Sequence, residues 1–152
     1  MSINSKNILA ITLARKGSEK IPRKNVVIIN GKPLIQYTID EVKKSKYIDR
    51  YVISTDDEEV DKIAKENGIE ARHRPAELCT SAAKSSDALI DCVNWAGSNM
   101  YTYIVEIMCT NPLKTVGDID SCIEKIELTG AHSVVSVVRV FDHHPSRIKY
   151  IR

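Results

Sequence analysis

The sequence lacks the features that mark membrane-spanning, disulfide-stabilised and zinc-binding proteins. No apolar run approaches the roughly 20 residues that a helix needs to span a bilayer, and the first residues carry no apolar signal-peptide core. The four cysteines are far apart, form no C-x-x-C pair and have no histidine at ligand spacing. We therefore expect free thiols, no zinc site and a cytoplasmic protein that does not act at a membrane.

Neither charge sign dominates the chain, and the common nucleotide signatures are missing. There are 22 Lys and Arg against 20 Asp and Glu, a net charge of +2, which argues against general affinity for nucleic acid. Neither G-x-x-x-x-G-K-[ST] nor G-x-G-x-x-G occurs, and no Ser-His-Asp or Cys-His arrangement is suggested by motif. Any anion-binding role must therefore come from the local placement of charge.

Apolar runs alternate with helix-like patterns through the 152 residues, a length that suits one domain with a substantial core. This alternation is typical of β-α-β units around a mostly parallel sheet, so we expect an α/β fold in a single domain over residues 1–152. Strands are predicted at 8–13, 51–54, 69–71, 101–107 and 134–138, with helices in the segments between them.

Helix boundaries can also be predicted from capping residues. Pro33 suits the first position of one helix. Thr55 and Glu58 have the spacing of a capping box at the start of the next. Thr115 and Asp118 are expected to cap the last predicted helix.

A basic loop follows the first predicted strand. Residues 13–25 read Leu-Ala-Arg-Lys-Gly-Ser-Glu-Lys-Ile-Pro-Arg-Lys-Asn, in which five cations accompany one anion, Glu19. Open α/β sheets bind ligands at the carboxyl ends of their strands, and cations with free backbone N–H groups suit a polyphosphate. We favour phosphate binding here, although the residues alone also allow a solvated basic loop.

Three predicted loops, 14–25, 72–86 and 108–115, follow carboxyl ends of strands and should converge on one crevice. Cations and small polar groups outnumber carboxylates in them, which favours an anionic nucleotide over a hydrolytic site. The candidate residues are Arg15, Ser18, Lys24 and Asn25 in the first loop, Arg74, Ser81, Ser85 and Ser86 in the second, and Thr110, Asn111 and Lys114 in the third.

Several motifs occur in a fixed order along residues 7–150: 13–18 with 22–25, 31–35, 54–58, 74–78 and 110–115, followed by His143-His144-Pro145. In these motifs and their order, the chain resembles the acylneuraminate cytidylyltransferases, also called CMP-sialic acid synthetases. Each motif is weak alone, and their order makes the signal specific. The resemblance implies a three-layer α/β/α Rossmann-like nucleotide-diphospho-sugar transferase fold with a mostly parallel sheet.

The resemblance also implies an activity and assigns site residues. Such enzymes transfer CMP from CTP to the anomeric hydroxyl of a nonulosonic acid of the sialic or legionaminic type, releasing pyrophosphate with Mg²⁺. Arg15 and Lys24 would act in catalysis, the first as a two-pronged donor and the second as a point charge. The nucleotide-binding positions would be Ala14, Arg15, Ser18, Lys24, Asn25, Arg74, Ser85, Thr110 and Asn111.

The sequence departs from the family pattern at several positions. Glu19 places an anion in the phosphate loop, Met108 replaces a glutamine, and Ser81 replaces an aspartate. Family members also continue into a dimerisation arm and the aspartates that hold Mg²⁺, so we expect no metal ligand within the chain and a homodimer for the full-length protein. Two alternatives stay open: a catalytically silent domain or fragment that binds CTP or CMP, and activation of 3-deoxy-manno-octulosonate.

Overall fold

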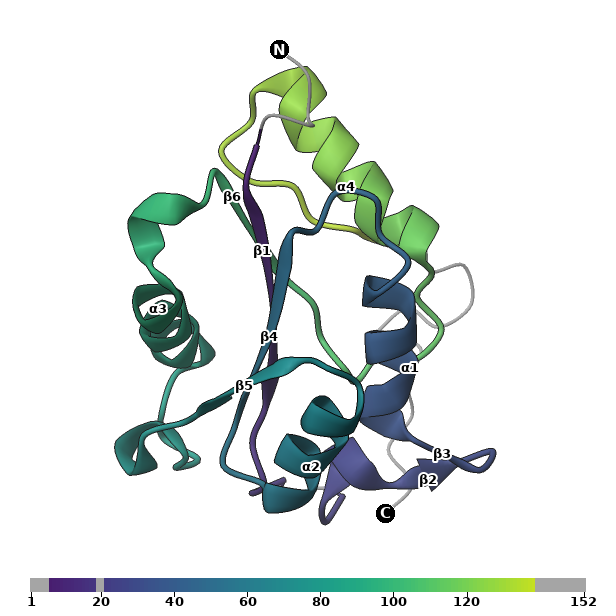
Figure 1. The fold of residues 1–152 in the computed structure, drawn as a ribbon, viewed down its shortest axis with the longest axis vertical. Helices are drawn as coiled ribbons and strands as arrows, with labels where there is room; N and C mark the ends of the chain where they lie inside the picture. Colours follow the sequence, from purple (N-terminus) through teal and green to yellow (C-terminus); the bar gives the residue numbers. More distant parts are fainter. Residues whose placement is uncertain (1–5, 19–20, 139–152) are drawn as a thin grey trace, which may run out of the picture.

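A parallel four-stranded sheet forms the centre of the protein. The structure, a computed structural model, describes residues 6–18 and 21–138. In space the strand order is β5-β4-β1-β6, and every neighbouring pair is parallel (Figure 1). The strands are β1 (Ile8–Ala14), β4 (Arg50–Thr55), β5 (Glu70–His73) and β6 (Tyr103–Glu106).

Strand β1 lies inside this sheet because its sequence is apolar on both faces. Its first four residues, 8–11, are completely buried, as expected for a central strand that is covered from both sides. Ile11 is opposite Val52 of β4 on one side and opposite Glu106 of β6 on the other. Strands β4 and β6 therefore end near the point where β1 gives way to the basic loop.

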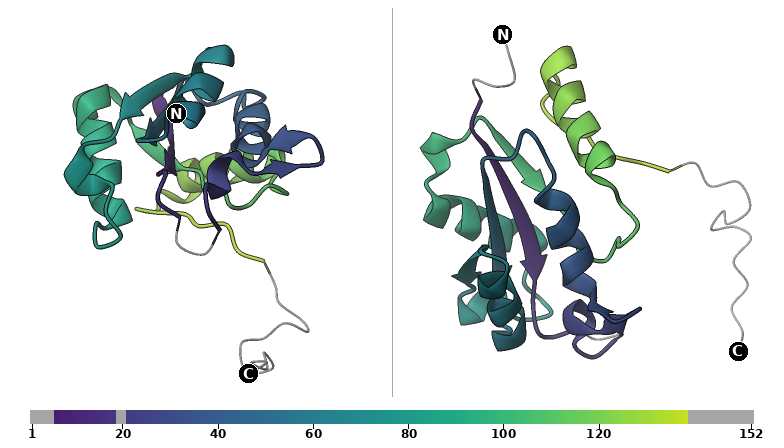
Figure 2. Two further views of the ribbon diagram at one scale, coloured as in Figure 1. Left: turned by 90° about the horizontal axis from the view of Figure 1, so that it is seen from below. Right: turned by 45° about the vertical axis from the view of Figure 1, so that its right-hand side comes forward.

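Helices cover both faces of the sheet. The helices are α1 (Leu34–Val42), α2 (Glu58–Glu66), α3 (Ser85–Ala96) and α4 (Val116–Thr129). Helices α1, α2 and α4 share one hydrophobic cluster with the sheet, whereas α3 packs on the other face through Cys92 and Ala96 (Figures 1 and 2). This three-layer α/β/α arrangement confirms the predicted fold class.

The capping prediction is correct at α4 and wrong at α2. At α4, the Thr115 hydroxyl accepts from the Asp118 N–H while the Asp118 carboxylate accepts from the Thr115 N–H. At α2 the cap is Asp57, which accepts from the Glu59 N–H at 3.0 Å. Thr55 cannot start the helix because it is still part of β4, where its hydroxyl donates to the carbonyl of Ala14 at 2.7 Å.

Pro33 does not occupy the first position of helix α1, contrary to the prediction. It lies just before α1 with an extended backbone, because Lys32–Pro33 forms strand β3 and pairs with β2 (Ile28–Ile29) in a two-stranded antiparallel sheet. The short hairpin is tied to α1 by the Tyr37 hydroxyl, which donates to the Ile29 carbonyl at 2.7 Å. The proline therefore ends a strand instead of opening the helix.

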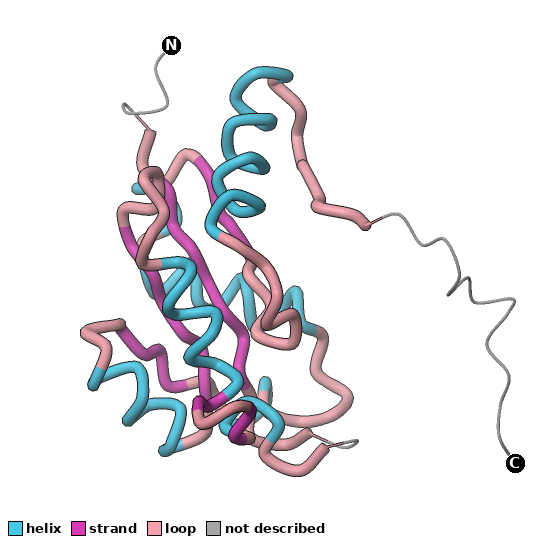
Figure 3. Tube along the Cα trace, turned by 90° about the vertical axis from the view of Figure 1, so that its right-hand side faces the viewer, coloured by secondary structure: helices cyan, strands magenta, loops and turns pink. Residues whose placement is uncertain are grey.

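The predicted final strand at 134–138 is wrong. This segment runs as loop from the end of α4, and Val135, Val137 and Val138 are 77%, 90% and 83% exposed (Figure 3). Among the described residues β6 pairs only with β1, so the valines have the β propensity of a strand without a partner. The motif His143-His144-Pro145 lies outside the described residues.

The four cysteines are free thiols, as predicted. Cys92 lies on the buried face of α3, and burial raises the pKa of its thiol to about 11. In the described ranges, no helix combines the length and apolar character needed to cross a bilayer.

Because the capping box at α4 has both of its hydrogen bonds, Thr115→Ala should lower the free energy of unfolding by about 1 kcal/mol. Urea denaturation measures the change. The control is Thr129→Ala at the other end of the same helix, where the hydroxyl donates to the Lys125 carbonyl. We expect a clearly smaller loss there, and equal losses in the two variants would contradict a capping role for Thr115.

Candidate functional site

A polar cavity of about 340 Å³ opens at the carboxyl ends of β1 and β6. Loops from three parts of the chain reach it, because parallel strands deliver their following loops to one edge of the sheet. The segment after β5 and the first residue of α3 complete its wall. The lining residues are Leu13, Arg15, Gly17, Ser18, Lys24, Asn25, Arg74, Ser85, Glu106, Met108, Cys109 and Thr110.

Most of the predicted nucleotide-binding residues meet at this cavity. They are Arg15, Ser18, Lys24, Asn25, Arg74, Ser85 and Thr110. Ala14 is not among the lining residues, because it is completely buried at the end of β1. Asn111 lines a different cavity of about 810 Å³, between β6, α4 and residues 134–138.

Arg74 differs from the other lining cations because its side chain is buried. It is only 4% exposed, and its guanidinium donates to the hydroxyl and the carbonyl of Ser54 at 3.1 and 3.0 Å. Within the described residues no Asp or Glu forms an ion pair with it, and burial lowers its pKa. A buried cation without a counter-ion is costly, so an anion entering the cavity would gain strongly from Arg74.

Arg15 and Asn25 join the three loops. The Arg15 guanidinium donates to the Thr80 carbonyl at 2.9 Å, which connects the first loop to the second. The Asn25 side chain donates to the Arg15 carbonyl at 2.9 Å and accepts from the Cys109 thiol at 2.9 Å, which connects the first loop to the third. Asn25 is 6% exposed, so its contacts within the protein fix the position of Arg15.

Arg23 and Lys24 are adjacent cations with different surroundings. Arg23 has a left-handed backbone and forms ion pairs with Asp57 and Glu59 at 2.8 and 2.9 Å. The hydrogen bond that Arg23 donates to the Asp57 carboxylate raises the pKa of Arg23. Lys24 instead lines the cavity. The acidic start of α2 thus neutralises one cation of the loop and leaves the next for a ligand.

Lys16 also contacts an acidic residue, through its backbone N–H and not through its side chain. Its N–H donates to the Asp56 carboxylate at 2.7 Å, while its side chain is exposed. Glu19 and Lys20 lie outside the described residues. Among the cations that the structure does describe in residues 13–25, Arg15 and Lys24 are therefore the ones that line the cavity.

The amino end of α3 adds backbone donors. Ser85, its first residue, lines the cavity, and no side chain caps the N-terminus of this helix of 12 residues. The first N–H groups of an uncapped helix and its dipole favour a negative charge nearby. Ser85 and the amino end of α3 at this side of the cavity therefore favour an anion there.

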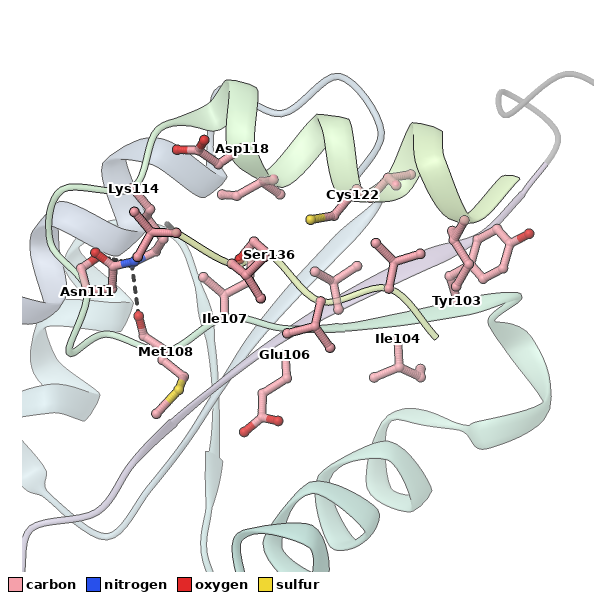
Figure 4. A pocket seen from close by; sticks show the side chains of 18 of the residues that line it. Tyr103, Ile104, Glu106, Ile107, Met108, Asn111, Lys114, Asp118, Cys122 and Ser136 are labelled. Atoms are coloured by element: carbon pink, nitrogen blue, oxygen red, sulfur yellow. Dashed lines mark hydrogen bonds between the residues drawn. The ribbon is translucent and has the colours of Figure 1, made fainter. Parts of the chain in front are cut away.

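Lys114 does not serve the cavity as the sequence suggests. Its ammonium donates to the Thr38 hydroxyl at 2.7 Å and to the carbonyls of Met108 and Asn111 at 2.9 and 2.7 Å (Figure 4). Burial lowers its pKa. Lys114 thus braces the loop after β6, and that brace positions Thr110 at the cavity.

Glu106 is the charged lining residue that the sequence analysis did not name. It is the last residue of β6, and among the described residues it is the one carboxylate that lines the cavity. The alternation of strand residues could have found it, because Ile104, Glu106 and Met108 lie on one face of a strand with a period of two.

The described residues do not form a complete binding site for a divalent metal by themselves. No group of three or more His, Cys, Asp or Glu side chains able to bind a metal lies in the described part of the chain. Mg²⁺ commonly binds through one or two carboxylates together with substrate phosphates and water. Glu106 and the nearby hydroxyls therefore suit a metal that arrives with a polyphosphate ligand.

Solved structures share this architecture. The protein is similar to a CMP:2-keto-3-deoxy-manno-octonic acid synthetase complexed with CTP, with a TM-score of 0.71 and 18% identity over 82% of this chain and 49% of that one. It is also similar to a 4-diphosphocytidyl-2C-methyl-D-erythritol synthase, with a TM-score of 0.63 and 14% identity over 80% of this chain and 55% of that one. At these identities the likeness establishes the fold.

Proteins similar in sequence are also cytidylyltransferases. An N-acylneuraminate cytidylyltransferase of Oncorhynchus mykiss is 32% identical over 140 residues, which cover 91% of this chain and 31% of the relative. A pseudaminic acid cytidylyltransferase of Campylobacter jejuni is 34% identical over 120 residues, which cover 77% of this chain and 52% of the relative. The chain thus spans a third to a half of these relatives. Because the sequence pattern of the family described as cytidylyltransferase matches residues 9–148, the chain belongs to the cytidylyltransferase family.

Proposed function

We propose that the cavity binds the triphosphate of CTP, and that the protein takes part in transferring CMP to the anomeric hydroxyl of a nonulosonic acid with release of pyrophosphate. The observation that carries this proposal is the buried guanidinium of Arg74, which lines the cavity beside Arg15 and Lys24 and has no carboxylate partner among the described residues. Membership of the cytidylyltransferase family supports a cytidine nucleotide as the source of the anion.

The reaction needs positioning and charge more than a protein nucleophile. When the anomeric hydroxyl attacks the α-phosphorus, negative charge grows on the non-bridging oxygens and on the departing pyrophosphate. Arg15 can donate to two oxygens at once, Lys24 supplies a compact charge, and the N-terminus of α3 supplies backbone donors. A divalent metal bound with the nucleotide would neutralise further phosphate charge.

The acceptor is proposed from relatives and not from the cavity. The relatives act, by their names, on N-acylneuraminate and pseudaminic acid, which favours an acidic nine-carbon sugar. Met108 and Glu106 lie at the β6 side of the cavity, where Met108 is largely exposed and can offer an apolar contact but no strong hydrogen bond. Met108 is the side chain that we expect to influence which sugar acid is accepted.

A second candidate function is nucleotide binding without turnover. The chain spans 31% and 52% of the two relatives, and its described residues place a single carboxylate at the cavity. Binding requires only the cations, the hydroxyls and the backbone donors that are present. Turnover also requires a bound metal and an acceptor, to which other parts of a longer protein or a second copy could contribute.

Arg15→Ala should weaken CTP binding about tenfold or more, because it removes a charged donor from the cavity. The matched control is Lys16→Ala, which removes the same charge from the next residue, whose side chain is exposed and does not line the cavity. We expect Lys16→Ala to change the Kd by about twofold or less, since solvent screens exposed charge.

Isothermal titration calorimetry with CTP and Mg²⁺ measures both variants against the unmodified chain. Equal effects of the two substitutions would mean that only general positive charge attracts the nucleotide. An unmodified chain that binds no CTP would overturn the proposed function.

A pyrophosphate-release assay separates the two candidate functions. With CTP, Mg²⁺ and a panel of sugar acids, we expect release above background with N-acylneuraminate or another nonulosonic acid, and less with 3-deoxy-manno-octulosonate. CTP binding without release for any acceptor would favour the non-catalytic function. Release that is fastest with the eight-carbon acid would contradict the proposed acceptor class.

A further inference from the structure

Glu106 stands out as an acidic side chain on an otherwise cationic cavity. It ends β6, and its side chain points to the side of the strand away from α4 (Figure 4). Glu106 lines the cavity of about 340 Å³ together with Arg15, Lys24 and Arg74, and it also lines the cavity between β6 and α4. A lone carboxylate here would repel the phosphates that the three cations attract.

Two acidic residues between β4 and α2 have structural partners in the basic loop of residues 13–25, whereas Glu106 has none in the part of the chain described. Asp56 accepts from the backbone N–H of Lys16 at 2.7 Å. Asp57 caps α2 and forms an ion pair with Arg23 at 2.8 Å. No hydrogen bond or ion pair within the described residues engages the carboxylate of Glu106, although it is exposed at the same cavity as three cations. Its conformation therefore leaves both oxygens for a ligand.

A carboxylate beside a triphosphate is compatible with binding when a divalent cation lies between the two. Mg²⁺ prefers oxygen ligands in octahedral geometry, keeps several waters, and is commonly bound by one or two carboxylates together with substrate phosphates. A single free carboxylate at a phosphate-binding cavity can supply one oxygen ligand of this kind. It cannot form a metal site alone, which agrees with the lack of a three-residue cluster in the described ranges.

We propose that Glu106 contacts the divalent cation that accompanies CTP, directly or through one of the metal's water ligands, and so couples nucleotide binding to the metal. This inference rests on the proposed function of the cavity. It differs from the expectation drawn from the family resemblance, in which all the metal ligands lie outside this chain. Here β6 supplies one contact, and phosphate oxygens, water and other groups supply the rest.

The test is a set of CTP titrations of the full chain, with Mg²⁺ and with EDTA, for the unmodified protein and for Glu106→Gln. In the unmodified protein Mg²⁺ should strengthen CTP binding. In Glu106→Gln this gain should shrink about tenfold, the lower end of the range for a lost metal-shell contact. Binding in EDTA should become tighter or stay unchanged, because the variant removes a repulsive charge.

Glu77→Gln is the matched control. Glu77 is an exposed carboxylate in the second loop that does not line the cavity, so the variant makes the same change of charge. It should leave the dependence on Mg²⁺ unchanged. Because Glu106 is also exposed, both variants should fold, and equal melting temperatures would verify this.

An independent readout follows Mn²⁺ by electron paramagnetic resonance in the presence of CTP. Protein-bound Mn²⁺ should decrease in Glu106→Gln and not in Glu77→Gln. If Glu106→Gln weakens CTP binding equally with Mg²⁺ and with EDTA, Glu106 contacts the nucleotide itself and the metal proposal is wrong. If the variant strengthens binding equally under both conditions, or changes neither, the proposal is also wrong.

Failure of the proposed function gives a different result. In that case the unmodified protein binds no CTP under either condition, and the metal inference fails with it. CTP binding that Mg²⁺ affects equally in the unmodified protein and in Glu106→Gln overturns the metal inference alone.

Discussion

The pairing of β1 with β4 on one side and β6 on the other is the constraint on which the site depends. Because the strands are parallel, their carboxyl ends lie at one edge of the sheet, and the loops that follow must meet there. Complete burial of residues 8–11 fixes this register, since a slip would expose apolar side chains. The cavity is thus a consequence of how the core packs.

Side chains from all three loops then hold that edge together. Asn25 and Arg15 connect the loops through hydrogen bonds to Cys109 and to the Thr80 carbonyl, and Lys114 braces the last loop on α1 through Thr38. These contacts place donors before any ligand arrives, which lowers the ordering cost of binding. Residues that brace the loops and residues that line the cavity are mixed along the sequence, so position in a motif does not separate the two.

Charge is distributed by the same packing. The amino end of α2 neutralises Arg23 through Asp57 and Glu59, whereas the adjacent Lys24 lines the cavity. The buried guanidinium of Arg74 donates to Ser54 and has no carboxylate partner among the described residues, and the Glu106 carboxylate lines the same cavity. A chain of nearly balanced net charge thereby obtains a locally cationic cavity with one carboxylate.

Local patterns were enough to predict the α/β class, four of the strands, the Thr115 cap and most of the residues that line the cavity, because periodicity and capping act over a few neighbouring residues. They failed where a distant partner decides the outcome. Thr55 belongs to a strand because Ala14 lies beside it, and 134–138 stays unpaired because β6 bonds only to β1 among the described residues. Which loop cation lines the cavity also depended on packing between segments far apart in the chain, which no local pattern encodes.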